Sequence, residues 1–431
     1  MTTPKTTALK STETARQVRP LVKKMYARGL EARERGQTVA YVMVGTQCDE
    51  LLWALDVVPI WTENYAGLCA AKRVAQPFIV KAEAEGYSNL ICGYARTGIG
   101  FDAMRAEQGG IPPEAPDGGM AEPDLLIGCS HRCDPRFKWY QALGRYKETP
   151  LFNFDIVYPG AGTDLKAIRE YYIQYQKEQF AELVAFLEQH TGRKLDKDRL
   201  RQIVTRAEEI RRLWWDAYEL RRALPCPMPG QDHFNIFVPH HFMIGEEDTL
   251  NFYRDLYQEL KQRVDQGLGA IANEKYRLLW GGGLPPWHSM IIFIYLESLG
   301  AVVVREATYR PPEPMEMNPG EDPLEFMARR SFDRYTWYHQ RALEWGGDPE
   351  AQLLLDWIKD YRADGIVMHA SKSCRATTIG QIHFKNMLQE HAGVPSLFLE
   401  SDIVDVRDYS EAQTKLQIDA FMETVAHSKK G

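Results

Sequence analysis

The chain has 431 residues, of which 44% are hydrophobic and 26% charged, and its formal net charge is -7. This length exceeds one ordinary hydrophobic core, and the composition excludes a disordered or fibrous protein. Lysine and arginine are interspersed with acidic residues instead of forming a basic stripe, which argues against nucleic acid as a partner.

The N-terminal segment, residues 1–36, predicts a polar helix that starts near Ala15 and ends at Gly36. It has no apolar core of the kind found in signal peptides, and the longest apolar run, MIIFIYL, is too short to span a membrane. We therefore expect a cytoplasmic protein without membrane contact. In that reducing compartment the seven cysteines are core residues, nucleophiles or metal ligands, not disulfides.

The rest of the chain predicts an α/β fold with three parts. Segment 37–163 alternates short β-branched runs (AYVMVGT, VVPIWTEN, DLLIGC, PLFNFDI) with helical stretches, which is typical of a parallel sheet covered by helices. Segment 164–265 is a helical connector that includes a long helix stopped before Pro225. One face of this helix is apolar: Leu200, Ile203, Ala207, Ile210, Trp214 and Tyr218. Strand and helix alternation resumes over 266–431, a second α/β domain.

The two α/β segments resemble each other. Each contains an aspartate, a short apolar strand and then a polar loop that carries cysteine: DLLIGCSHRC in the first and DGIVMHASKSC in the second. Setting Cys133 against Cys374 places Ser130 on Ser371. The sequence therefore predicts two similar parallel-sheet units, Rossmann-like or flavodoxin-like, joined by a helical segment.

Three cysteines are candidates for a metal centre. In open parallel sheets, ligands bind beyond the carboxyl ends of the strands. Cys133 follows a strand that ends near Ile127, Cys374 follows a strand that ends near Met368, and Cys92 lies in the glycine-containing loop NLICGYARTG. Three thiolates from three separated loops can hold three irons of a cubane cluster and leave the fourth iron for another ligand.

The alternative for any one cysteine is a small buried hydrophobe, which is the commoner role in a cytoplasmic protein. The loops around Cys133 and Cys374 favour the ligand role because Arg132, Lys372 and Arg375 lie there. Such cations would stabilise thiolates and the charge of a cluster.

The other four cysteines have weaker claims. Cys69 and Cys226 lack polar surroundings, and we expect them to be structural. Cys129 forms a C-x-x-x-C pair with Cys133, but the third cysteine expected of radical enzymes that use S-adenosylmethionine does not follow. Cys48, at the start of a predicted helix, is interpreted as a capping and packing residue. Whether Cys48 or Cys129 adds a further sulfur ligand stays open.

Other familiar sites are disfavoured. Gly98, Gly100 and Ala103 form a G-x-G-x-x-A pattern, but a cysteine-bearing loop precedes it where a dinucleotide site needs a strand. The sequence has no G-x-x-x-x-G-K-[ST] phosphate loop. His240 and His241 are adjacent and cannot share one helical face, which argues against zinc ligation.

The segment WGGGLPPWHSM is a candidate for substrate binding. Gly281, Gly282 and Gly283 permit a ligand to approach the backbone closely, Trp287 offers an aromatic wall, and His288 is a candidate proton donor. The alternative is a tight turn followed by a core tryptophan.

Several of these motifs together resemble the benzoyl-CoA reductase and 2-hydroxyacyl-CoA dehydratase family. They are CDELLWALDVVPIW, the cysteine in ICGYART, the cysteine in SHRCDPRFKW, the WGGGLPP segment and the late SKSCR loop, and the resemblance extends from about Ala40 to Arg407. It favours the ATP-dependent benzoyl-CoA reductases within this family. It also implies Cys92, Cys133 and Cys374 as ligands of a [4Fe-4S] cluster, whereas Cys48 stands where dehydratases often have proline.

The resemblance further implies a heteromeric, anaerobic enzyme. A smaller related subunit would carry a cluster of its own, and two ATPase subunits with another iron-sulfur cluster would receive electrons from ferredoxin and use ATP to drive them uphill. The implied reaction is two-electron reduction of benzoyl-CoA to cyclohexa-1,5-diene-1-carboxyl-CoA.

Two rival hypotheses remain. A dehydratase subunit of the same family would bind a 2-hydroxyacyl-CoA and recycle its electrons. A non-catalytic scaffold or activator subunit would hold no cluster.

Overall fold

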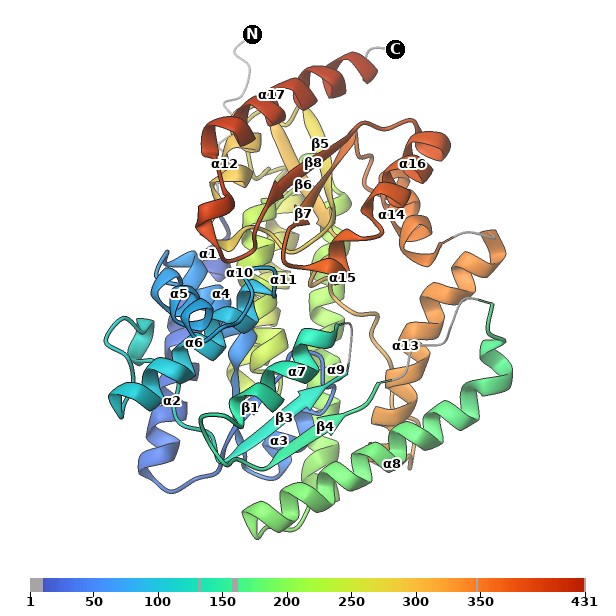
Figure 1. Ribbon diagram of the computed structural model, residues 1–431. Coiled ribbons are helices and arrows are strands. Elements are labelled where there is room, and N and C mark those ends of the chain that lie inside the picture. Colours follow the sequence, from blue (N-terminus) through green and yellow to red (C-terminus); the bar gives the residue numbers. More distant parts are fainter. Residues whose placement is uncertain (1–10, 131–132, 157–161, 346–347, 430–431) are drawn as a thin grey trace.

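The computed structural model describes residues 11–130, 133–156, 162–345 and 348–429; in helix α13 (Pro323–Trp345) the side chains are described as far as Arg334, and that of Thr336. Two four-stranded sheets, one below the other in Figure 1, form the scaffold, and every strand pairing in them is parallel. The predicted fold class, two similar α/β units, is therefore confirmed.

The two sheets have the same topology. The first has the order β2-β1-β3-β4, with β1 at Val39–Val42, β2 at Val58–Trp61, β3 at Leu125–Cys129 and β4 at Leu151–Phe154. The second has the order β6-β5-β7-β8, with β5 at Tyr276–Gly282, β6 at Ala301–Glu306, β7 at Gly365–Ser371 and β8 at Ser396–Ser401. All residues of β1, β2, β3 and β6 are buried, as expected for parallel strands covered on both faces.

A repeated aspartate explains part of this likeness. Asp124, just before β3, accepts the amide of Val39 at 2.9 Å and donates its own amide to the Val39 carbonyl at 2.7 Å. Asp364, just before β7, forms the same two bonds with Arg277, at 2.8 and 2.7 Å. The aspartate that the sequence repeat shares thus fixes the register of the second central strand against the first in both units.

Helices surround each sheet (Figure 1). Those of the first unit are α3 (Asp49–Ala54), α4 (Thr62–Ala71), α5 (Gln76–Ala84), α6 (Gly93–Gln108), η1 (Pro116–Gly118) and α7 (Asp134–Leu143). Those of the second are η3 (Trp287–Ser289), α12 (Ile291–Ser298), α14 (Pro349–Asp360), α15 (Arg375–Thr378), α16 (Gln381–Ala392), η4 (Val406–Asp408) and α17 (Glu411–Ser428). The N-terminal helices are α1 (Glu13–Arg16) and α2 (Val18–Glu34).

Between β4 and β5 the chain is helical, as α8 (Leu165–Thr191), α9 (Lys197–Glu219), η2 (Leu220–Arg222), α10 (Gly230–Phe242) and α11 (Glu247–Asp265). The six apolar residues predicted for one face of α9 are all buried. Helix α13 packs on α8 and α9, so part of the 266–431 segment lies with the connector helices (Figure 1). The exact domain boundaries stay a prediction.

The G-x-G-x-x-A pattern lies inside α6 and not at a strand-to-helix turn, so its glycines serve helix packing. In the part of the chain that the structure describes, no helix is long and apolar enough to cross a membrane.

Candidate metal centre at the junction of the two sheets

Cys133 and Cys374 occupy equivalent places in the two units. Strand β3 ends at Cys129 and β7 at Ser371, slightly later than the sequence predicted. Cys133 then caps the N-terminus of α7, and Cys374 caps that of α15. Both thiols therefore lie beyond the carboxyl ends of equivalent strands, as the repeat indicated.

Cys92 also stands at the start of a helix, as the N-cap of α6. The backbone amides of Tyr94 and Ala95 in the first turn act to lower the pKa of the Cys92 thiol, and that of Arg136 does the same for Cys133, in both cases against the larger effect of burial. Free amides at a helix N-terminus carry partial positive charge, so they favour a negatively charged sulfur. At Cys374 the hydroxyl of Thr377 donates to the sulfur at 3.2 Å.

The structure brings the three thiols within range of one another's charge. Burial raises the pKa of the Cys92 thiol, and the neighbouring thiols of Cys374 and Cys133 raise it further. Burial likewise raises the pKa of Cys133, against the lowering effect of Arg136, and Cys374 again adds to the rise. Since like charges at one place oppose each other, three thiolates here need a cation or a metal centre between them.

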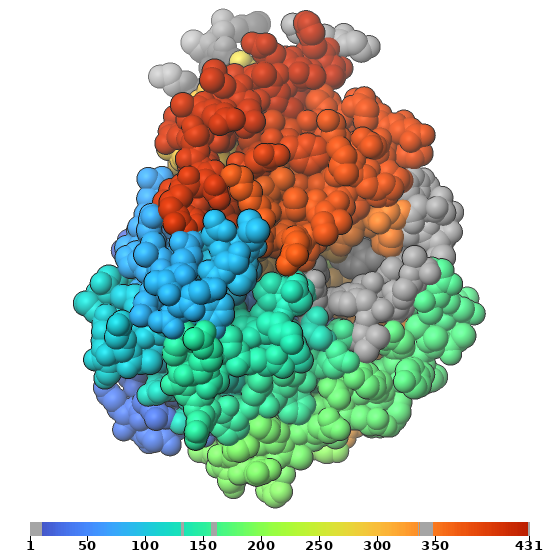
Figure 2. Space-filling model, in the orientation of Figure 1, coloured from blue at the N-terminus to red at the C-terminus, as the bar shows by residue number. Residues whose placement is uncertain are grey.

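Two of the cysteine loops are bonded directly. The Gly93 amide donates to the Ser373 hydroxyl at 3.1 Å, and that hydroxyl donates to the buried carboxylate of Asp402. The other Asp402 oxygen accepts the amides of Val404 at 2.8 Å and Asp405 at 2.9 Å. Asp402 therefore ties the start of α6 to the second sheet. Figure 2 shows the corresponding contact between the light-blue segment and the orange-red unit.

Among the residues with described positions, no three histidine, cysteine or acidic side chains are close enough to hold a single metal ion. Ligands of one ion must meet at one point, whereas the ligands of a cubane cluster each bind a different iron. Single-ion sites such as zinc are therefore not indicated at this place.

Four residues that the sequence analysis missed lie at the same site. The Arg136 guanidinium contacts the Glu63 carboxylate at 2.9 Å, and Glu63 also accepts the Val44 amide at 2.9 Å. Tyr94 and Tyr309 complete the group: burial raises the pKa of both hydroxyls, and Cys92 and Cys374 lie near enough to add to the rise at Tyr94 and Tyr309 respectively. Only Arg136 had a usable signal, since it follows Cys133 by three residues in the first turn of a helix.

Trp287 and His288 lie beside this group but are engaged in other contacts. The Trp287 indole donates to the Tyr94 hydroxyl, and its ring stacks on Phe237 at 6.0 Å. His288 is buried, with Nε2 at 3.0 Å from the Asp402 carbonyl and Nδ1 at 2.7 Å from the Ser289 hydroxyl. Burial lowers the pKa of His288. Both ring nitrogens of His288 already form hydrogen bonds within the chain. Its role as proton donor stays a prediction.

The three glycines have packing reasons for their identity. A Cβ atom on Gly281 would lie 2.4 Å from Ile366, and one on Gly283, whose φ is +77°, would lie 1.9 Å from the His369 carbonyl. Gly282 has more room, with its nearest neighbour at 3.6 Å. Substrate binding by this turn stays a prediction, while the close approach of β5 to β7 already requires small residues.

The remaining cysteines are fully buried. Burial raises the pKa of Cys48, which caps α3 and donates to the Thr46 hydroxyl at 3.0 Å; Cys129 lies near enough to raise it further. Cys226 donates to the Met228 carbonyl at 3.3 Å. Of the predicted cations, Lys372 is paired with Asp408 at 3.0 Å, and Arg132 lies outside the described residues.

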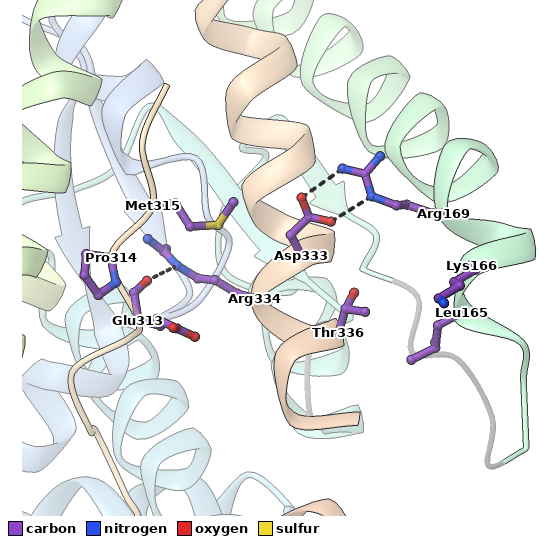
Figure 3. A pocket seen from close by; sticks show the side chains of 9 residues that line it. All are labelled: Leu165, Lys166, Arg169, Glu313, Pro314, Met315, Asp333, Arg334 and Thr336. Carbon is purple, nitrogen blue, oxygen red and sulfur yellow. Dashed lines mark hydrogen bonds and ion pairs between the residues drawn. The ribbon is translucent and has the colours of Figure 1, made fainter. Parts of the chain in front are cut away.

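A cavity of about 290 Å³ opens elsewhere, between α8, α13 and the loop at Glu313 (Figure 3). It contains none of the predicted site residues. Arg169 is held by both oxygens of Asp333, and Arg334 donates to the Glu313 carbonyl and to Glu208. These two arginines are already neutralised, and the cavity holds none of the predicted ligands, so the cysteine junction is the stronger candidate.

The chain is similar to known subunits of enzymes that act on CoA thioesters. The family model described as 2-hydroxyglutaryl-CoA dehydratase, D-component, matches residues 44–425. A benzoyl-CoA reductase subunit of Thauera aromatica is 28% identical, over 94% of this chain and 93% of its own length. The (R)-2-hydroxyisocaproyl-CoA dehydratase alpha subunit of Clostridioides difficile is 26% identical over 96% of both chains. The (R)-phenyllactyl-CoA dehydratase alpha subunit of Clostridium sporogenes is 25% identical over 93% and 92%.

Proposed function

This chain belongs to the 2-hydroxyglutaryl-CoA dehydratase D-component family, and from that premise we propose that it is the iron-sulfur, substrate-binding subunit of an ATP-dependent benzoyl-CoA reductase. The proposed reaction is two-electron reduction of benzoyl-CoA to cyclohexa-1,5-diene-1-carboxyl-CoA in the cytoplasm of an anaerobic cell. The single observation that supports the proposal is that the Cys92 and Cys374 loops are joined at the junction of the two sheets, with Cys133 near enough to add to the rise in the pKa of Cys92.

The donor set fits a [4Fe-4S] cluster. Three thiols come from three separate loops, which suits a cluster whose ligands bind different irons. Each stands at the N-cap position of a helix, where backbone amides act to lower the thiol pKa of Cys92 and of Cys133. Hydrogen bonds to sulfur and low solvent exposure are the features by which a protein sets a cluster's potential. When bound, such a cluster would supply electrons of very negative potential.

The chain's own residues would hold the site rigid and dry. Asp402 and Ser373 fix the spacing of the Cys92 and Cys374 loops. The Arg136–Glu63 pair keeps a neutralised cation beside Cys133, and the aromatic side chains packed around Trp287 would limit the access of water from that side. Exclusion of water strengthens electrostatic interactions with a reacting thioester.

The proposal includes partner subunits: a smaller related subunit with its own cluster, and two ATPase subunits that pass on electrons from ferredoxin. Large apolar side chains stand exposed beside the cysteine loops. Leu90 is 75% exposed near Cys92, and Ile379 and Ile382 are 77% and 59% exposed after Cys374. Exposed apolar side chains gathered at one place are a common feature of subunit contacts.

A dehydratase subunit is the second candidate. It is favoured by the dehydratase alpha subunits, which match at 25% and 26% identity over as much of the chain as the reductase subunit does. Incubation of the reduced complex with benzoyl-CoA and ATP, and separately with a 2-hydroxyacyl-CoA, distinguishes the two. A dienoyl-CoA product supports the reductase; an enoyl-CoA product from the hydroxy compound supports the dehydratase.

The cluster is tested by purifying the complex without oxygen and measuring iron and sulfide. Cys92→Ala, Cys133→Ala and Cys374→Ala should each lower bound iron and abolish turnover. Cys226→Ala, which changes a fully buried thiol of the connector, should do neither. Normal iron content in Cys374→Ala would refute the ligand assignment, and full activity in all three variants would favour a non-catalytic scaffold.

A further inference from the structure

Tyr309 has an unusual backbone for its residue type. Its φ is +54°, in the left-handed region that bulky side chains rarely adopt. It lies three residues beyond the end of β6, at the carboxyl edge of the second sheet. Strained positions persist where the surrounding structure holds them, and they gather at functional sites.

The ring of Tyr309 is held by aromatic neighbours from other elements. It stacks on Phe237 of α10 with centroids 4.1 Å apart and an interplanar angle of 15°. Trp287 lies 6.3 Å away and His241 of α10 lies 5.2 Å away. The ring therefore has a fixed orientation, and so does its hydroxyl.

The hydroxyl of Tyr94 lies beside that of Tyr309. The Trp287 indole can only donate, and it donates to the Tyr94 oxygen. Burial raises the pKa of Tyr309, and the neighbouring Tyr94 hydroxyl opposes that rise. Because the indole already occupies the Tyr94 oxygen, the proton of Tyr309 can go to another acceptor.

The surroundings of that proton are those of the cysteine junction. Burial raises the pKa of Tyr309; nearby Glu63 and Cys374 add to the rise, and nearby Arg136 opposes it. Glu63 and Arg136 are already paired with each other at 2.9 Å. A neutral hydrogen-bond acceptor bound here would therefore meet the rigidly held Tyr309 hydroxyl beside a wall of aromatic side chains.

We propose that Tyr309 is a catalytic residue whose hydroxyl donates a hydrogen bond to the thioester carbonyl oxygen of the bound acyl-CoA. This inference rests on the proposed function of the site. A carbonyl oxygen gains negative charge as its conjugated acyl group is reduced, and a preorganised donor stabilises that charge. The stack of Tyr309, Phe237 and Trp287 gives the acyl group an apolar wall.

The test compares benzoyl-CoA with S-benzyl-CoA, a thioether that has no carbonyl oxygen. Both are titrated by calorimetry into the complex, prepared without oxygen and without ATP so that no turnover occurs. The wild-type complex should bind the thioester about tenfold more tightly, the effect of one good hydrogen bond. Tyr309→Phe keeps the ring and its stack but should lose this preference.

Tyr26→Phe is the control, because it likewise removes a single tyrosine hydroxyl, here one in the core that is bonded to Asn64 at 2.6 Å. It should keep the tenfold preference. In turnover, Tyr309→Phe should raise KM for benzoyl-CoA about tenfold, the loss expected in the binding experiment, and lower kcat about 100-fold, because the hydrogen bond strengthens as charge develops on the carbonyl oxygen.

An unchanged preference in Tyr309→Phe, with normal iron content, overturns the role of Tyr309 and leaves the proposed function standing. A wild-type complex that binds neither compound contradicts the proposed function, and the role of Tyr309 with it.

Discussion

The Gly93 amide and the Ser373 hydroxyl form a 3.1 Å hydrogen bond between the two sheet units. Gly93 directly follows Cys92 and Ser373 directly precedes Cys374, so this one bond joins two of the cysteine loops. Its position is confined, because a Cβ atom on Gly93 would lie 2.6 Å from the Asp402 carboxylate. The spacing of the two thiols is thus set by a contact between parts of the chain 280 residues apart.

Ser373→Ala should therefore disturb both stability and iron binding. The substitution leaves the Gly93 amide without its acceptor and one oxygen of buried Asp402 without its donor, at a cost of about 1 to 3 kcal/mol. Urea unfolding of the chain and iron content of the complex measure the two effects. Ser298→Ala, at an exposed serine bonded within its own helix, should change neither. Wild-type iron retention in Ser373→Ala would show that this contact does not fix the loops.

The sequence was sufficient to predict the fold class because strand alternation and the repeated aspartate are local patterns. Asp124 and Asp364 each precede a central strand and bond to its neighbour in the same way. Strand ends were less predictable, since β3 runs on to Cys129 and β7 to Ser371 into segments with polar residues. Hydrogen bonding to the neighbouring strand, not composition, decides where each strand stops.

The site was predictable only where its residues follow equivalent strands. Cys133 and Cys374 could be found in this way, but Glu63, Tyr94 and Tyr309 come from three unrelated segments that meet only in the folded chain. Tyr309 has a left-handed backbone conformation, but glycine, the residue type that would indicate such a conformation in a sequence, does not stand at this position. His288 was chosen for its chemistry, but both of its ring nitrogens form hydrogen bonds, one with a serine hydroxyl and one with a backbone carbonyl. Sequence alone could not place these two partners.

Gly100→Ala should destabilise the first unit strongly. Helices α5 and α6 approach so closely here that a Cβ atom would lie 1.8 Å from the Phe78 carbonyl oxygen, a backbone atom that cannot turn aside. Overpacking of this kind costs roughly 1 to 3 kcal/mol or more. Thermal unfolding of the purified chain measures it.

Gly110→Ala is the control, because that glycine has nothing within 4 Å of the added carbon. It should leave the unfolding temperature almost unchanged. Equal stability of the two variants would mean that the α5–α6 approach is looser than the structure indicates. It would also reopen the question of why Gly98 and Gly100 form a dinucleotide-like pattern.

His369 should make the chain less stable in mild acid. Burial lowers its pKa to about 4, from an ordinary value of 6.5. Between these values the unfolded chain binds more protons than the folded one, so stability is full above pH 6.5 and falls as the pH drops to 4. The shift corresponds to on the order of 3 kcal/mol. Urea unfolding at several pH values measures this slope.

His369→Gln should reduce the slope between pH 6.5 and 4. Part of it should remain, because burial also lowers the pKa of His233 to about 4. His383→Gln, at an exposed residue of α16, should leave the slope as it is. An identical slope in wild type and His369→Gln would exclude His369 as its source.

Glu208 should be the carboxylate on which the connector most depends. Its carboxylate forms ion pairs with the guanidinium groups of Arg211 at 2.7 Å, Arg330 at 2.9 Å and Arg334 at 3.0 Å. In the described ion pairs, Glu50 is the only other carboxylate that contacts Arg211 and Arg330. Glu208→Gln takes the carboxylate partner from Arg334 and leaves Glu50 as the one carboxylate for Arg211 and Arg330 in the described ion pairs, which costs about 3 to 5 kcal/mol.

The neighbouring Glu209→Gln offers a direct comparison, because Glu209 pairs with Arg254 at 2.7 Å on the surface, where such a pair contributes about 1 kcal/mol or less.

Burial would raise the pKa of Glu208, but the three arginines outweigh it and hold the pKa at about 2, below the usual 4.5. Its contribution is therefore complete above pH 4.5 and is lost as the pH falls towards 2. Unfolding measured at pH 7 and at pH 3.5 should show a large difference between Glu208→Gln and wild type at pH 7 and a smaller one at pH 3.5. If the two Glu→Gln variants lose equal stability at pH 7, the buried cluster is no more important to the fold than a surface ion pair.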